Sequence, residues 1–180
     1  MVPGRLSDGG ATIRADMIQH LAFVLAVAMS APLGAAAQSP SVVGTWKLVS
    51  YETVTPAGVK TYPLGEDAVG LLIYQPSGRM SVQFMRRDRP RFTSGDAWRG
   101  TLDEERAAFE GFFSYAGRYT VDAMGGTVTH HIEICSAPNY VGTDVVRTFT
   151  MSGNRVSLRT PQRQLAGQTS SSTLIWERID

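Results

Sequence analysis

The sequence predicts an all-β fold, a single up-and-down antiparallel β-barrel of about eight strands with one short helix inserted between strands three and four. One sign is a series of short segments, apolar and polar in alternation, that turn residues such as Pro76-Ser77-Gly78 separate. The other is the pair of motifs at the two ends of this series, Gly44-Thr45-Trp46 and Trp176-Glu177-Arg178. Because a closed barrel has no free sheet edge, its first and last strands pair, and the ring of Trp46 can contact the guanidinium of Arg178.

The expected strands are bounded by proline, glycine and asparagine. The first strand ends at Pro56-Ala57-Gly58, and Pro76-Ser77-Gly78 joins the second and third strands into a hairpin. The eight expected strands span residues 43–55, 69–75, 79–86, 117–123, 127–135, 144–151, 155–160 and 172–179. Eight antiparallel strands enclose an interior that can hold one small ligand.

One segment, residues 102–115, is expected to be a helix. Thr101 precedes it and Glu104 follows three residues later, which is the capping-box arrangement of a helix start. Its apolar side chains, Phe109 among them, cannot all face water. We therefore expect the helix to lie over one barrel opening or against the barrel wall, as a plug or a lid.

The N-terminal segment is expected to be a secretory signal peptide. An apolar run at residues 21–29 is followed by small residues that end at Ala37, a cleavage pattern. The run is shorter than the roughly 20 residues that cross a bilayer, so no stable membrane anchor is expected. Residues 1–37 are thus expected to be removed near Ala37 and the protein to be secreted or periplasmic, with the start at Met1 or Met17 left open.

The remaining residues, 41–180, are expected to form one domain that folds on its apolar core. The single Cys135 provides no intramolecular disulfide, and we expect a monomer or a weak dimer. A formal net charge of +1 gives no general attraction for nucleic acid, which we exclude as a partner. The basic cluster at residues 86–91 is either a solvated loop or a gate whose positive field attracts acidic amphiphiles.

Several sequence blocks in order resemble one family. They are Gly44-Thr45-Trp46-Lys47-Leu48, Gly70-Leu71-Leu72-Ile73-Tyr74, Tyr115-Ala116-Gly117-Arg118-Tyr119, Gly126-Thr127-Val128-Thr129-His130-His131, Val141-Gly142-Thr143-Asp144 and the closing Trp176-Glu177-Arg178. Together they resemble the bacterial and fungal lipocalin-like domain family. The resemblance implies a calycin-type barrel with a cavity, and it transfers neither a ligand nor a catalytic residue.

Strand parity assigns side chains to the interior. On the strand at 127–135, it directs Val128, His130, Ile132 and Ile134 inward and Cys135 outward. His130 is then either a neutral core residue satisfied by hydrogen bonds, or a group that contacts a ligand or transfers protons.

Parity along the other strands completes a set of candidate ligand contacts. The set is Trp46, Leu48, Phe84, Tyr119, His130, Arg147 and Phe149. An inward Arg147 requires an anion, because an unpaired buried charge is costly. Its partner is expected to be a protein carboxylate such as Glu177 or Glu52, or else a ligand carboxylate or phosphate.

No metal or cofactor is expected. His131, Glu133 and Cys135 alternate on one strand face, but the first and third lie roughly 13 Å apart along a strand, too far for one ion. No nucleophile motif such as G-x-S-x-G occurs in the sequence.

These observations favour a binding protein over an enzyme. The leading hypothesis is a secreted lipocalin-like protein that holds a small hydrophobic or amphipathic, possibly acidic, molecule in its barrel cavity. The alternative is a cofactor-independent isomerase, dehydratase or cyclase, in which His130 with Tyr119 or Tyr74 transfers protons.

Overall fold

The computed structural model describes residues 41–165 and 167–180. The expected signal peptide, residues 1–37 with its cleavage near Ala37, lies outside the described residues. In the described part of the chain, no helix is long and apolar enough to cross a bilayer.

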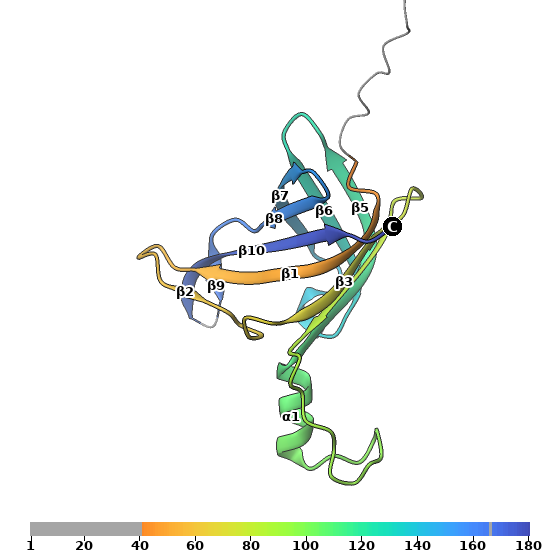
Figure 1. Ribbon diagram of the computed structural model, residues 1–180, viewed down its shortest axis with the longest axis vertical. Coiled ribbons are helices and arrows are strands. Elements are labelled where there is room, and N and C mark those ends of the chain that lie inside the picture. Colours follow the sequence, from red (N-terminus) through yellow and green to blue (C-terminus); the bar gives the residue numbers. More distant parts are fainter. Residues whose placement is uncertain (1–40, 166) are drawn as a thin grey trace, which may run out of the picture. The chain divides into compact units, whose positions relative to one another are not determined.

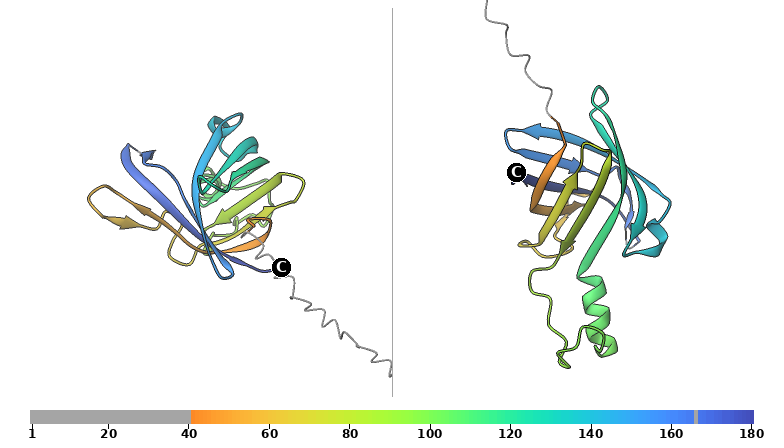
Figure 2. Two further views of the ribbon diagram at one scale, coloured as in Figure 1. Left: turned by 90° about the horizontal axis from the view of Figure 1, so that it is seen from above. Right: turned by 90° about the vertical axis from the view of Figure 1, so that its right-hand side faces the viewer.

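Eight strands close into an antiparallel barrel, as predicted (Figures 1 and 2). They are β1 (Gly44–Val54), β3 (Val69–Tyr74), β4 (Arg79–Met85), β5 (Phe112–Asp122), β6 (Thr127–Cys135), β7 (Asp144–Ser152), β8 (Arg155–Arg159) and β10 (Gln168–Arg178). Each strand pairs with the next in this order, and β10 returns to pair with β1. Two short strands pair with the ends of longer ones: β2 (Lys60–Thr61) with β1, and β9 (Arg163–Leu165) with β10. A 3₁₀ helix, η1 (Pro138–Tyr140), links β6 to β7.

The helix placement predicted from the sequence needs two corrections. The helix α1 (Leu102–Glu110) lies between β4 and β5, the fourth and fifth strands in chain order, and not between the third and fourth. The count differs because the short β2, which the sequence pattern did not predict, comes earlier in the chain. The helix also ends at Glu110 and not at residue 115. From Phe112 onward the chain pairs with β4, and the hydrogen bonds of that long-range ladder replace those of the helix.

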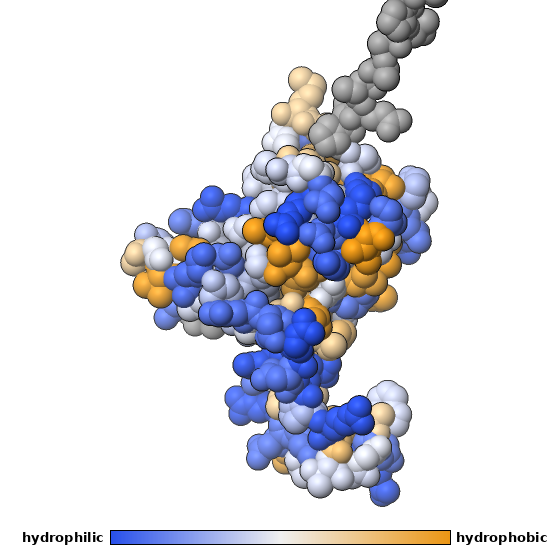
Figure 3. All heavy atoms as spheres, in the orientation of Figure 1, coloured by the Kyte–Doolittle hydropathy of each residue, from blue (hydrophilic) through white to orange (hydrophobic). Residues whose placement is uncertain are grey.

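The helix begins where the sequence pattern predicts, but its apolar side chains are not buried as expected for a plug or a lid. The capping box of Thr101 and Glu104 is formed. Every residue of α1 is exposed or half-buried, and Phe109 remains 58% exposed. The helix and the loop before it extend away from the strands (Figure 2), and hydrophilic side chains cover most of this arm in Figure 3.

A β-bulge in β6 changes the expected facing of two residues. Opposite β5, the register skips Glu133, because Ala116 pairs with Ile134 while Gly117 pairs with Ile132. One extra residue reverses the side-chain parity beyond it. Ile134 is therefore 67% exposed, and Cys135 packs against the core, the reverse of the sequence expectation.

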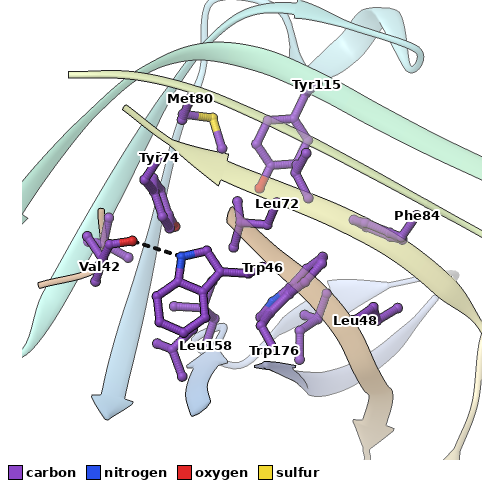
Figure 4. Packing of buried hydrophobic residues seen from close by; sticks show 14 of the residues in the cluster. Val42, Trp46, Leu48, Leu72, Tyr74, Met80, Phe84, Tyr115, Leu158 and Trp176 are labelled. Atoms are coloured by element: carbon purple, nitrogen blue, oxygen red, sulfur yellow. Dashed lines mark hydrogen bonds between the residues drawn. The ribbon is translucent and has the colours of Figure 1, made fainter. Parts of the chain in front are cut away.

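One end of the barrel interior is filled by large side chains. Figure 4 shows Trp46 among Leu72, Leu158 and Trp176, all of them buried. The indole nitrogen of Trp46 donates a 2.9 Å hydrogen bond to the carbonyl of Val42. This end of the barrel is thus a packed floor.

Arg178 ties the two ends of the domain together as predicted. Its guanidinium lies 4.1 Å from the ring centroid of Trp46, its partner in the β1–β10 register. The same group donates to the carbonyls of Val43 at 2.6 Å and Ser41 at 2.8 Å. A stacked cation with two further hydrogen bonds stabilises the closure between the first and last strands.

We expect Arg178→Met to lower the free energy of unfolding by about 2 kcal/mol, because the cation–π contact and two charge-assisted hydrogen bonds are lost. Urea unfolding followed by tryptophan fluorescence measures the change. Arg155→Met is the matched control, since Arg155 forms an exposed pair with Glu177 and should change stability by less than about 0.5 kcal/mol. Equal effects of both substitutions would refute a special role for Arg178.

Candidate functional site

A cavity of about 310 Å³ lies at the end of the barrel interior opposite the packed floor. Its lining comes from β1, β4, β5, β6, β7 and β10, and is mostly apolar or aromatic; it includes Tyr51, Phe84, Phe113, Ile132, Val145 and Leu174. Phe109 and Glu110, at the end of α1, also line it. A concave, mainly apolar site with a few polar groups is typical of small-molecule binding.

Arg147 projects from β7 into this apolar surrounding. Its side chain is 6% exposed, and one terminal nitrogen, Nη2, donates a 3.3 Å hydrogen bond to the Tyr115 hydroxyl. The other terminal nitrogen, Nη1, is buried and has no hydrogen-bond partner among the described residues. The cavity is therefore lined by a guanidinium with unused donors.

The carboxylates expected to pair with Arg147 lie elsewhere. Glu177 accepts from Lys47 at 3.0 Å and Arg155 at 3.1 Å, and Glu52 pairs with Lys60. Both glutamates alternate with inward-facing neighbours on their strands and so face outward. The expectation of an internal ion pair at Arg147 through either residue is wrong.

His130 links two tyrosines in the interior. Its side chain is 1% exposed, with Nε2 lying 2.5 Å from the Tyr74 hydroxyl and Nδ1 lying 2.7 Å from the Tyr115 hydroxyl. Burial, followed by the charge of Arg147, lowers the pKa of His130 well below its usual range. Burial likewise raises the pKa of Tyr74 well above its usual range. The histidine and Tyr74 are therefore neutral at physiological pH.

These contacts form one chain of side chains, Tyr74–His130–Tyr115–Arg147, which we call the polar chain. Tyr115 and Arg147 line the large cavity. Behind them, a void of about 10 Å³ is lined by His130 and Arg147 together with residues of the floor such as Trp176. The polar chain thus separates the packed floor from the cavity.

The structure brings together three of the candidate contacts predicted from the sequence. Phe84 and Arg147 line the large cavity, and His130 joins them at the small void behind it. His130 reaches the large cavity only through Tyr115, because both of its ring nitrogens are occupied.

The other four candidates lie outside the lining of both spaces. Trp46 and Leu48 belong to the core, and Phe149 packs against it. The Tyr119 hydroxyl donates to the carbonyl of Gln75 at 2.8 Å, and its ring packs on Tyr74. The role of these four in ligand contact stays a prediction.

Two important lining residues were missed in the sequence. The helix expected from the sequence ends at Tyr115, although Phe113, Tyr115 and Gly117 alternate as a strand would. Arg163 lies in the unpredicted β9, where its Nη1 donates to the Tyr140 hydroxyl at 3.1 Å. No local periodicity marks Arg163, since its place depends on the pairing of β9 with β10.

The outer face of β6 carries ion pairs. Glu133 accepts from Arg79 at 2.8 Å and from Arg118 at 3.2 Å, and His131 contacts Asp144 at 2.7 Å. Over the part of the chain that the structure describes, no three potential metal ligands converge.

Comparison with known proteins identifies the class to which this barrel and cavity belong. Residues 43–179 match the model of the lipocalin-like domain. The chain therefore belongs to the lipocalin-like domain family, which confirms the resemblance seen in the sequence.

Two particular proteins are similar to this chain. A 4'-hydroxy-3'-methoxypropiophenone carrier protein of Aspergillus oryzae is 31% identical over 107 residues, a match covering 56% of this chain and 96% of that protein. A solved lipocalin-like protein from Bacteroides uniformis is 12% identical, with 76% of this chain and 97% of that chain covered at a TM-score of 0.39. The second likeness is too weak to bear on the site.

The buried neutral His130 predicts acid sensitivity. The folded state resists protonation while the unfolded chain takes up a proton at about pH 6.5, so lowering the pH favours unfolding. Between about pH 6.5 and the lowered pKa of the folded state, His130 should reduce stability by about 1.4 kcal/mol per pH unit.

Urea unfolding of wild type and His130→Gln from about pH 7.5 to pH 5 measures this loss, since carboxylates in unfolded chains titrate below that window. His130→Gln should be less stable at neutral pH but should show a flatter pH dependence. The His131→Gln variant separates the contribution of the neighbouring histidine. The same slope in wild type and His130→Gln would contradict the assignment.

Proposed function

We propose that this protein is a carrier that holds a small hydrophobic or amphipathic molecule in its barrel cavity. The observation that carries the proposal is the apolar cavity of about 310 Å³, whose lining includes Arg147 with a buried donor, Nη1, that has no partner among the described residues. Such a site shields the apolar body of a ligand from water and orients its polar end. The similarity to a protein named as a carrier supports the same reading.

The positions of the proton-transferring groups favour a carrier over the isomerase, dehydratase or cyclase alternative. Acid–base catalysis needs a group within hydrogen-bond reach of the reacting atom. His130 is occupied by two tyrosine hydroxyls, and Tyr119 is bound to a backbone carbonyl outside the cavity lining. Neither His130 nor either of its proposed partners, Tyr119 and Tyr74, lines the large cavity.

The carrier is also proposed to act outside the cytoplasm. The apolar run at residues 21–29 and the small residues ending at Ala37 support removal of a signal peptide. Expressed with its own N-terminus in a Gram-negative host, the protein should be recovered from the periplasm, and N-terminal sequencing should begin at Gln38. Recovery of the uncleaved chain from the cytoplasm would contradict secretion.

The cavity itself can be tested with the neutral fluorescent probe N-phenyl-1-naphthylamine. We expect saturable binding with a blue-shifted emission. Val145→Phe should weaken it by about tenfold or more, because Val145 lines the cavity and the larger ring takes up ligand space.

Val146→Phe is the matched control, since this neighbour on β7 faces outward and is exposed. It should bind the probe as wild type does. If the folded wild-type protein does not bind the probe saturably, or if both valine variants bind equally well, the cavity is not the carrier site.

A further inference from the structure

We propose that the carried molecule is an organic acid, and that Arg147 and Tyr115 bind its carboxylate at the inner end of the cavity. This inference rests on the proposed carrier function and names the chemistry of its ligand. It follows from three features of the site: an uncompensated buried cation, a second cation on the same lining, and the direction of the hydrogen bonds in the polar chain.

The first feature is the charge of Arg147. A guanidinium is charged at every physiological pH and carries five donors. In the described part of the chain its only hydrogen-bond partner is the Tyr115 hydroxyl at 3.3 Å, longer than a typical charge-assisted pair. Nη1 is buried without a partner on the cavity lining. A buried cation of this kind is stabilised strongly by an anion that enters the cavity.

The second feature is Arg163, whose guanidinium also lines the cavity. Its Nη1 donates to Tyr140, and its Nε is buried with no partner among the described residues. Within the described lining, the only carboxylate is that of Glu110, which pairs with Arg106 at 2.9 Å. The lining therefore carries an excess of positive charge in an apolar surrounding, which selects for an acidic ligand.

The third feature is the direction of the hydrogen bonds at His130. Neutral imidazole has one donor and one acceptor nitrogen. If Tyr74 donates to Nε2, then Nδ1–H donates to Tyr115, whose oxygen also accepts from Arg147. The Tyr115 hydroxyl proton is then free to point into the cavity. In the opposite direction the unpaired proton would be that of Tyr74, which lines neither the cavity nor the small void, whereas the Tyr115 proton can be paired by a ligand in the cavity, so we assign the first direction.

With this assignment, two residues that line the cavity each have a donor without a protein partner, Tyr115 O–H and Arg147 Nη1–H. A carboxylate has two oxygens and no proton, so it can accept both bonds, and its charge offsets that of the guanidinium. A neutral amide or alcohol can accept a hydrogen bond but leaves the charge of Arg147 unmatched. The site should therefore discriminate by charge as well as by shape.

The test uses a pair of ligands that differ in charge but hardly in shape, 2-naphthoate and 2-naphthamide. Each is titrated at about pH 7 against protein loaded with N-phenyl-1-naphthylamine. We expect wild type to bind 2-naphthoate about tenfold or more tightly than 2-naphthamide, because hydrogen bonds to a charged group are the stronger ones.

Arg147→Met should remove this preference, because it should lower the affinity for 2-naphthoate about tenfold or more relative to that for 2-naphthamide. Methionine is a tolerable replacement, since apolar substitution of a buried charge is often neutral or stabilising. A cooperative urea-unfolding transition, followed by tryptophan fluorescence, shows that the variant is folded. Tyr115→Phe is the second variant, and it should weaken 2-naphthoate severalfold more than it weakens 2-naphthamide.

Tyr74 is a positioning residue in this scheme, because it acts on the ligand only through His130. ¹⁵N NMR of the imidazole reports which nitrogen carries the proton, and we expect Nδ1–H in wild type. Tyr74→Phe should allow Nε2–H to form and should weaken 2-naphthoate binding. A proton on Nε2 in wild type would overturn the assigned direction.

The outcomes separate this inference from the carrier function on which it rests. If neither the neutral probe nor 2-naphthamide binds, the carrier function itself fails. If both neutral molecules bind but 2-naphthoate has no advantage, or keeps it in Arg147→Met, the cavity remains a carrier site and the organic-acid proposal is overturned.

Discussion

The pairing of β1 with β10 is the constraint on which the rest of the structure depends. It runs from Trp46 opposite Arg178 to Val54 opposite Ser171, and joins the two ends of the domain. Without this ladder, the strands from β3 to β8 would form an open sheet with exposed edges. Closure converts one sheet face into an interior and thereby decides that Trp176, His130 and Arg147 meet around one small void.

The small interior of an eight-stranded barrel is used in two different ways. At one end, Trp46 and Trp176 fill it, and Arg178 holds this floor against the first and last strands. At the other end, the side chains leave a cavity of about 310 Å³. The packed floor and the cavity thus lie at opposite ends of the same barrel, and under the proposed carrier function a ligand would occupy the cavity without displacing the floor.

The polar chain between these two ends is costly for the fold. A buried histidine, two tyrosines and an arginine could be replaced by apolar residues of similar volume, often with no loss of stability. The Arg147 charge is the clearest case, because within the described residues its only hydrogen-bond partner is the Tyr115 hydroxyl. An arrangement that is unfavourable in the empty barrel and favourable with an acid bound is expected of a binding site.

Local pattern in the sequence determined the strands, the capping box of Thr101 and Glu104, the contact of Trp46 with Arg178 and the inward facing of His130 and Arg147. These features follow from side-chain alternation, from motifs within a few residues and, for Trp46 with Arg178, from the pairing of first and last strands that a closed barrel requires. The tertiary structure alone decided the end of α1, the bulge at Glu133 that turns Ile134 outward, the place of Tyr115 and Arg163 on the cavity, and the absence of Glu52 or Glu177 from Arg147. Each of these depends on which distant strand a segment pairs with, and a one-residue change in that register reverses the facing of every side chain beyond it.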